Sequence, residues 1–205
     1  MQGPGTFGRR NFSWGLGSFA VLALPAGGLA PALVRARPGA LPTGWGPRSL
    51  WVTRPQAQES VRAVYWAEGR VQAQGYAALN RLYRDIDRNI EHPMALGLLD
   101  LNFAMQQCLF KARAPRPMVL LSGFRTRVTN ARVGGVEPNI HGLGLADDYI
   151  YEGLGLPDNI HLARLFQVGG LGIYPERGAL HKDVGRLRSW VTHGRAGAPA
   201  ARDRP

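Results

Sequence analysis

The chain has 205 residues, 45% of them hydrophobic, which is enough for one folded domain with short additions. Its formal net charge is +11, but residues 1–50 contribute +5 and residues 186–205 contribute +4, so the central part carries only +2. Nucleic-acid-binding domains concentrate basic residues on the folded surface, so this distribution argues against a specific nucleic-acid partner. The single cysteine, Cys108, excludes an intrachain disulfide and is expected to be a buried core residue of the apolar stretch FAMQQCLF.

The N-terminal region has the features of an export signal. Arg9 and Arg10 are adjacent, and residues 11–34 carry no charge. Gly and Pro interrupt this stretch, which makes it a poor membrane-spanning helix, and the Ala-Pro-Ala sequence at residues 30–32 is a small-residue cleavage site. We therefore expect residues 1–32 to form a twin-arginine signal peptide. The alternatives are a retained anchor and a disordered basic leader.

The rest of the chain divides by composition into three parts. Residues 33–54 are rich in Pro, Gly and Arg and are expected to form a linker. Residues 55–193 contain the periodic apolar segments and are expected to form the folded domain. Residues 194–205, GRAGAPAARDRP, have a composition typical of a disordered tail.

Helices and strands alternate irregularly along the expected domain. Glu59–Tyr76 has the pattern of a hairpin around the turn-like AEG, and Pro93 lies near the start of the second helical segment. The expected helices cover residues 76–90, 92–112 and 156–168, with a helical turn at 128–133, and the later strands cover 117–123, 145–151, 171–175 and 179–184. Helices come early and strands late, so we predict an α+β fold in which helices flank a small antiparallel sheet.

The stretch HGLGLADD, residues 141–148, has the composition of half a metal site. His141 and Asp148 are seven residues apart, which is about 23 Å in an extended chain at roughly 3.3 Å per residue. Ligands of one metal ion lie within a few ångströms of each other, so the chain must turn between them. Gly142 and Gly144 allow the backbone conformations that such a turn requires.

The two adjacent aspartates of this stretch cannot both face one site. In a strand over residues 145–151, Asp147 and Asp148 point to opposite faces. Asp148 lies between Ala146 and Ile150 on its face, where a carboxylate is costly unless it is paired with a cation. We therefore assign Asp148 to the site.

The later stretch ALHKDVG supplies a second histidine. His181 and Asp183 share one face of a predicted strand, and Lys182 points away. Two histidines and one carboxylate are a three-ligand zinc set that leaves a fourth position for water. The alternative is that His141 is a loop residue and His181 a hydrogen-bonded histidine of the core or surface.

Several motifs, in order, carry a family resemblance. SGFRTRVTNARVGG, HGLGLADD, GGLGIYP and HKDVGRLRSW resemble the motifs of the D-alanyl-D-alanine carboxypeptidase and murein endopeptidase family of zinc peptidases. The likeness covers about residues 55–190 and is greatest to the twin-arginine-exported murein endopeptidases of Gram-negative bacteria. It implies that His141, Asp148 and His181 hold Zn²⁺ at the centre of the α+β fold.

The resemblance also implies that Arg125 and Ser122 line the substrate cleft. The planar guanidinium of Arg125 suits a peptide rich in carboxylates, since it pairs with them bidentately. The alternative is that Arg125 only ties down the loop after the strand MVLLSG.

The general base is not fixed by the resemblance. Gly178 stands where some branches of the family have an acid, Asn139 replaces the usual Ser, and Lys182 replaces an apolar residue. Asp183 is the first candidate for the catalytic base, although it could instead orient His181. Glu176 is the second candidate.

These features predict a zinc-dependent peptidase that hydrolyses amide bonds in murein cross-links or stem peptides with a zinc-activated water. The alternative is a non-catalytic module of the same fold that binds peptidoglycan or zinc. We expect a periplasmic monomer whose partner is peptidoglycan and whose only membrane contact is through the export signal.

Overall fold

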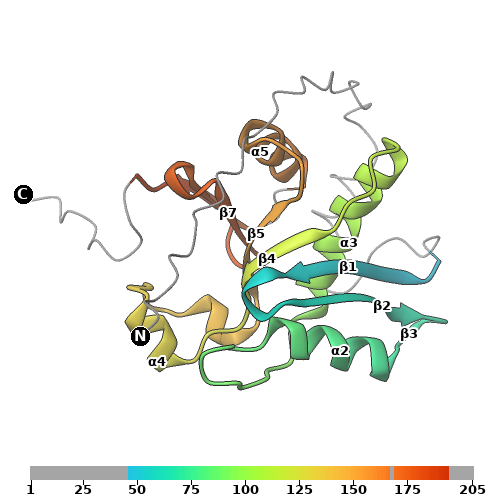
Figure 1. Ribbon diagram of the computed structural model, residues 1–205, viewed down its shortest axis with the longest axis horizontal. Coiled ribbons are helices and arrows are strands. Elements are labelled where there is room, and N and C mark those ends of the chain that lie inside the picture. Colours follow the sequence, from blue (N-terminus) through green and yellow to red (C-terminus); the bar gives the residue numbers. More distant parts are fainter. Residues whose placement is uncertain (1–45, 167–168, 194–205) are drawn as a thin grey trace, which may run out of the picture.

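The computed structural model describes residues 46–166 and 169–193 (Figure 1). The expected signal peptide, the first part of the expected linker and the expected tail lie outside the described residues. Within the described ranges, no helix is both long and apolar enough to cross a membrane.

Eight strands, four α-helices and three short 3₁₀ helices make up the described part of the chain. The strands are β1 (Arg48–Arg54), β2 (Glu59–Ala67), β3 (Arg70–Val71), β4 (Met118–Ser122), β5 (Ala146–Tyr151), β6 (Gly170–Tyr174), β7 (Ala179–Asp183) and β8 (Arg188–Val191). The helices are η1 (Pro55–Ala57), α2 (Ala73–Tyr83), α3 (Leu96–Lys111), α4 (Arg127–Arg132), η2 (Ile140–Leu143), α5 (Leu156–Leu165) and η3 (Pro175–Arg177).

All eight strands belong to one sheet with the order β3-β2-β1-β4-β5-β7-β6-β8. The pairs β1–β4 and β6–β8 are parallel, and the other pairs are antiparallel. The predicted α+β class is therefore confirmed, but the expectation of a small antiparallel sheet is wrong, because the sheet is large and mixed.

Strand β1 explains much of this difference. It lies inside residues 33–54, which we expected to form a linker because the segment is rich in Pro, Gly and Arg. Arg48 and Arg54 of β1 are both buried. Arg48 Nη1 lies 2.8 Å from Asp100 Oδ1, and Arg54 Nη1 donates to the carbonyl oxygens of Leu82 at 2.6 Å and Arg84 at 2.5 Å. The folded region thus begins before residue 55.

The helices differ from their expected ranges mainly at their ends. The predicted hairpin is present as β2 and β3, which pair around the turn at Gly69, where φ is 72°. Helix α2 begins at Ala73, earlier than expected, and ends at Tyr83. Arg84 has an extended ψ of 159° and makes two hydrogen bonds with Glu59 at 2.7 and 2.8 Å. These contacts hold the chain after Tyr83 out of the helix.

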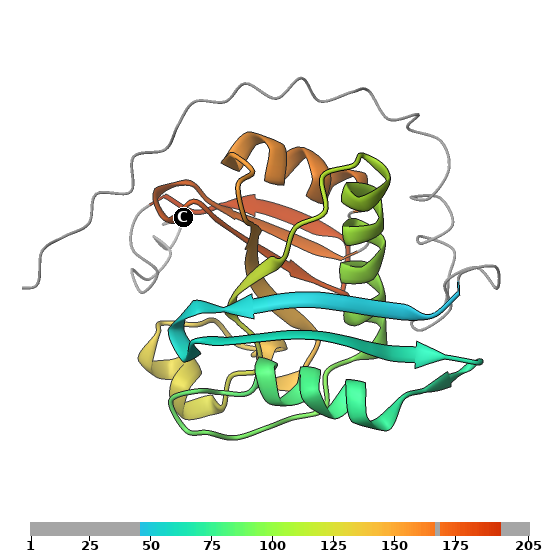
Figure 2. The same cartoon turned by 45° about the vertical axis from the view of Figure 1, so that its right-hand side comes forward.

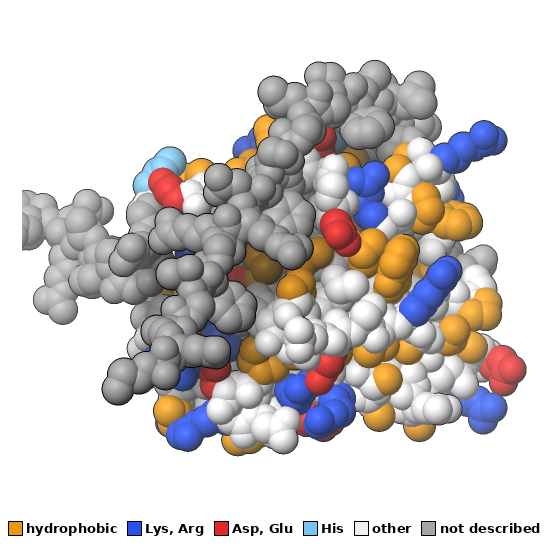
Figure 3. All heavy atoms as spheres, viewed as in Figure 1, with side chains coloured by type: hydrophobic (Ala, Val, Ile, Leu, Met, Phe, Trp, Pro, Cys, Tyr) orange, Lys and Arg blue, Asp and Glu red, His pale blue; other side chains and the backbone are white. Residues whose placement is uncertain are grey.

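The helices pack against the sheet, whose central strands are β4 and β5. Figures 1 and 2 show α2 alongside β2, α3 passing β1, and α5 beside the half of the sheet that contains β5 and β7. Cys108 is buried on α3, as predicted. On the face shown in Figure 3, basic, acidic and apolar side chains are interspersed.

Candidate metal centre

The turn that carries His141 is the 3₁₀ helix η2. Asn139 caps it, because its side-chain oxygen accepts from the Gly142 N–H at 3.1 Å. The Asn139 amide also donates to the Arg125 carbonyl at 2.9 Å, which ties the turn to the loop that follows β4. Gly144 ends η2 with φ at 67°, and a Cβ there would lie 2.5 Å from the Pro93 carbonyl oxygen. Only glycine fits this position.

The pairing of β5 with β7 places Asp148 beside His181. In this register Asp148 lies opposite His181 and Asp147 lies opposite Lys182. As strand alternation predicts, Asp147 and Asp148 point to opposite faces of the sheet. Asp147 is buried in the core, whereas Asp148 faces the turn that carries His141.

His141, Asp148 and His181 converge on one point. His181 Nδ1 lies 3.0 Å from Asp148 Oδ1 and 3.1 Å from His141 Nε2, and His141 Nε2 lies 3.4 Å from Asp148 Oδ1. One ligand atom of each residue lies within 4.8 Å of the others. The two imidazoles are buried, and the Asp148 side chain is 19% exposed.

The outer nitrogen of each imidazole already has a partner. His141 donates from Nδ1 to the Gly123 carbonyl oxygen at 2.8 Å, and His181 donates from Nε2 to Asp183 Oδ2 at 3.1 Å. In the neutral tautomers that donate from these outer nitrogens, the inner nitrogens His141 Nε2 and His181 Nδ1 present lone pairs beside a carboxylate oxygen. Such a set can hold a cation, and two imidazoles with one carboxylate fit the ligand preference of zinc.

The electrostatics of the cluster also favour a cation. Burial by itself would raise the pKa of Asp148, but His141, His181 and Arg125 hold the pKa well below its usual range. Burial by itself would lower the pKa of His181, but hydrogen bonds with Asp148 and Asp183 raise it above its usual value. The cluster thus attracts positive charge.

Asp183 lies behind His181 rather than inside the cluster. Its side chain is 0% exposed. Besides the His181 N–H, it accepts from the backbone N–H groups of Gly170 at 2.9 Å and Gly185 at 2.8 Å and from the guanidinium of Arg188 at 2.7 and 3.2 Å. Burial would raise the pKa of Asp183, and these hydrogen bonds lower it instead. Of the two roles considered for Asp183, this geometry favours orientation of His181 over the role of base.

Arg125 and Ser122 both lie next to Asp148. Arg125 Nη2 is 3.3 Å from Asp148 Oδ2, and Ser122 is the strand partner of Asp148 in the β4–β5 pair. Arg125 Nε is buried, and no partner for it is found among the described residues. A buried donor without a partner calls for an explanation, and a ligand bound to the exposed end of this guanidinium is one that favours the substrate role of Arg125 over a purely structural one.

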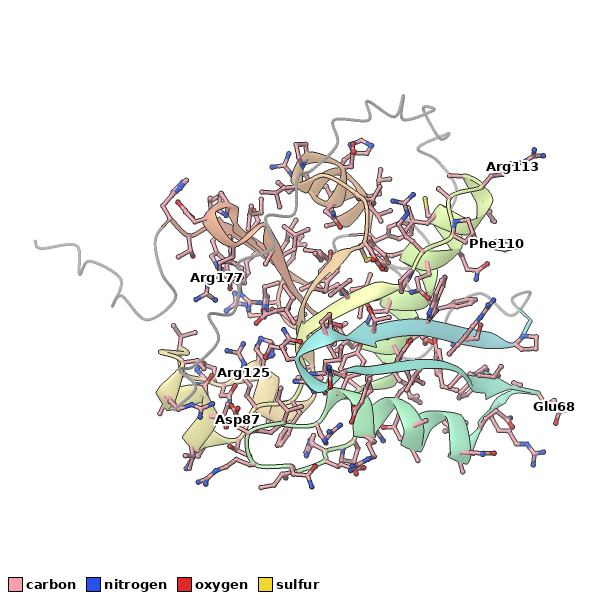
Figure 4. The ribbon with its side chains drawn as sticks, in the orientation of Figure 1. Glu68, Asp87, Phe110, Arg113, Arg125 and Arg177 are labelled. Carbon is pink, nitrogen blue, oxygen red and sulfur yellow. The ribbon has the colours of Figure 1, made fainter. Side chains whose placement is uncertain are left out.

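Three residues beside the cluster were given no role from the sequence. Trp190 packs against His181 with ring centroids 5.2 Å apart. Gly172 makes room for it, since a Cβ there would lie 2.6 Å from the indole. Burial raises the pKa of Tyr174, and Asp148 adds to the increase. Arg125 and Arg177 lower the pKa of the same phenol in part, and Figure 4 shows these two arginines on one side of the molecule.

The motifs GGLGIYP and HKDVGRLRSW contain Tyr174 and Trp190, so the sequence contained a signal for both. Glu176, the second candidate for the base, lies in η3 with its side chain 48% exposed, and it accepts from His193 Nδ1 at 3.2 Å.

Comparison with known proteins agrees with the motifs. The sequence model of the family described as peptidoglycan L,D-endopeptidase MepK matches residues 43–190. The MepK proteins of Escherichia coli K12, Escherichia coli O157:H7 and Shigella flexneri are each 32% identical over 150 residues, covering 70% of this chain and 80% of the relative. The predicted membership in a family of murein endopeptidases is therefore confirmed. The chain belongs to the family of peptidoglycan L,D-endopeptidase MepK.

Proposed function

We propose that this chain is a zinc-dependent peptidase that hydrolyses amide bonds in peptidoglycan, and that His141, Asp148 and His181 hold the metal. The observation that carries the proposal is the convergence of these three ligand atoms within 4.8 Å, with both imidazoles fixed from outside. Zn²⁺ bound there would lower the pKa of a coordinated water toward about 7 and polarise the scissile carbonyl. The names of the relatives support an L,D cross-link as the substrate bond.

The residues around the cluster divide the remaining work. Arg125, whose side chain is 16% exposed and whose Nε has no partner among the described residues, binds the peptide through a carboxylate or carbonyl oxygen. Asp183 keeps the proton of His181 on Nε2 and so leaves Nδ1 free for the metal. Glu176 is the more exposed of the two candidate bases and is therefore the carboxylate to test for proton transfer. Glu176→Gln should lower kcat and leave zinc content unchanged.

Digestion of purified peptidoglycan by the purified full chain tests the proposal. Mass spectrometry of the products should show loss of L,D-cross-linked dimers, inhibition by a chelator and recovery when zinc is added. His141→Ala is the matched control and should release no product. Stoichiometric zinc without turnover would instead support a non-catalytic peptidoglycan-binding module.

We also propose that residues 1–32 direct the protein to the periplasm by the twin-arginine route. Arg9, Arg10 and the uncharged segment after them support this proposal, as does a substrate that lies outside the cytoplasm. We propose further that the protein acts as a monomer, because a single chain supplies all three candidate ligands.

A further inference from the structure

The core side of the β5–β7 pair holds a buried ionic cluster directly behind the candidate metal centre. Lys182 Nζ lies 2.5 Å from Asp147 Oδ1. The other carboxylate oxygen, Oδ2, accepts from Asn102 Nδ2 at 2.8 Å and from the Tyr83 hydroxyl at 3.2 Å. The ammonium also lies 3.1 Å from the centroid of the Tyr149 ring. The side chains of Asp147 and Lys182 are 0% and 5% exposed.

A buried ionic cluster of this kind adds little to the free energy of unfolding. The attraction within a buried ion pair often fails to offset the cost of removing both charges from water. Proteins with well-packed apolar residues in its place are often equally stable or more stable. In some proteins a buried charge is retained because it selects one arrangement of the chain over another. The arrangement to be selected here is visible in the sequence of β5.

Strand β5 contains two adjacent aspartates that are chemically equivalent as metal ligands. A shift of the strand by one residue would exchange their faces and bring Asp147 opposite His181. Neighbouring β7 alternates in the same way, with Lys182 on the core side between His181 and Asp183 on the other. The Lys182 ammonium lies on the core side, so it stabilises whichever of the two aspartates points to that side, here Asp147.

We propose that Lys182 is a positioning residue that holds Asp147 in the core and thereby reserves the metal site for Asp148. Without the ammonium, the Asp147 carboxylate is buried without a cation, which is strongly unfavourable. The strand then gains by moving Asp147 toward His141 and His181, where it competes with Asp148. This inference rests on the proposed function, because it concerns the ligands of the same site.

The test uses Lys182→Met, which keeps the length of the side chain and removes its charge. In the folded variant, zinc affinity measured by chelator competition should fall by roughly 10-fold or more, as for other residues that orient metal ligands. The visible absorption spectrum of the Co²⁺-substituted protein should also change, because it reports the geometry of the ligands. Adding Asp147→Leu removes the competing carboxylate, so the double variant should recover both the affinity and the spectrum.

A second buried ion pair in the same domain provides the matched control. Arg48 and Asp100 lie 2.8 Å apart, each 6% exposed, and the Tyr65 hydroxyl donates to Asp100 at 2.8 Å. Arg48→Met should lower thermal stability in the same way as Lys182→Met and leave zinc affinity and the Co²⁺ spectrum unchanged. Should Lys182→Met not fold, Tyr83→Phe removes one hydrogen bond from Asp147 and should weaken zinc binding, whereas Tyr65→Phe should not.

Three results would overturn the inference alone: unchanged zinc affinity in Lys182→Met or its milder substitute, an equal loss in the control, or no recovery in the double variant. A wild-type protein that binds no zinc would overturn the proposed function and the inference together.

Discussion

Replacing Asp183 with Asn separates its two candidate roles. The Asp183 oxygens differ in their partners: Oδ1 accepts from the Gly170 and Gly185 N–H groups and from Arg188 Nη1, whereas Oδ2 accepts from His181 Nε2 and Arg188 Nη2. The single oxygen of an Asn side chain suits the three donors around Oδ1. Its NH₂ group then faces His181, and it can donate only to an unprotonated Nε2.

When Nε2 of His181 becomes the acceptor, the imidazole proton moves to Nδ1, the nitrogen that faces Asp148. The lone pair needed by a metal is lost unless the hydrogen bond breaks. We expect zinc affinity to fall by roughly 10- to 100-fold, or about 1.4–2.7 kcal/mol. The free energy of unfolding should fall by about 1.5–3 kcal/mol for the lost hydrogen bonds to a charged group. The low end is expected, because the Arg188 side chain is 42% exposed and can turn to solvent.

The assay combines chelator competition for zinc affinity with the hydrolysis rate at saturating zinc. Asp85→Asn is the matched control, because Asp85 is also a buried carboxylate that accepts several hydrogen bonds, including those from the Thr126 N–H and hydroxyl. It should lose stability without losing zinc affinity. The reasoning is refuted if Asp183→Asn binds zinc normally while the rate falls by a factor on the order of 10² to 10⁴, since that result identifies a general base.

Three further predictions concern the ligands, the substrate and export. His141→Ala and Asp148→Ala should each reduce zinc content from one per chain to a small fraction, because each removes one of three ligands; elemental analysis showing full occupancy would place the site elsewhere. Arg125→Lys should raise KM by about 10-fold with unchanged zinc content, because a lysine cannot pair bidentately; steady-state kinetics with an unchanged KM would leave only a structural role. Replacing Arg9 and Arg10 with Lys should leave unprocessed protein in the cytoplasm, and cell fractionation showing normal export would contradict the twin-arginine signal.

Local patterns along the chain predicted part of the site. Strand alternation placed Asp147 and Asp148 on opposite faces, and the two glycines of HGLGLADD indicated the turn that returns His141 to the strand. Both features depend on backbone geometry within a few residues, so they can be read without knowledge of the rest of the fold. The ordered motifs likewise identified the family without a structure.

The extent of the sheet could not be predicted in this way. The Pro-, Gly- and Arg-rich composition of residues 33–54 indicated a linker. Yet Arg48 and Arg54 are buried in β1, because Asp100 and the carbonyls at the end of α2 accept their hydrogen bonds. These partners lie 28 to 52 residues away in the sequence. A charged side chain can be buried only where the fold places such a partner beside it, and the composition of one segment carries no information about that partner.

The sequence by itself determined the family, the α+β class and the residues that can serve as ligands. Only the tertiary structure decided which nitrogen of His181 faces the cluster and on which side of the ring Asp183 lies. Strand alternation places His181 and Asp183 on the same face, and it says nothing about the direction in which either side chain turns. That direction is set by Gly170 of β6 and by Gly185 and Arg188 of the stretch after β7, which surround the Asp183 carboxylate and hold it behind the imidazole.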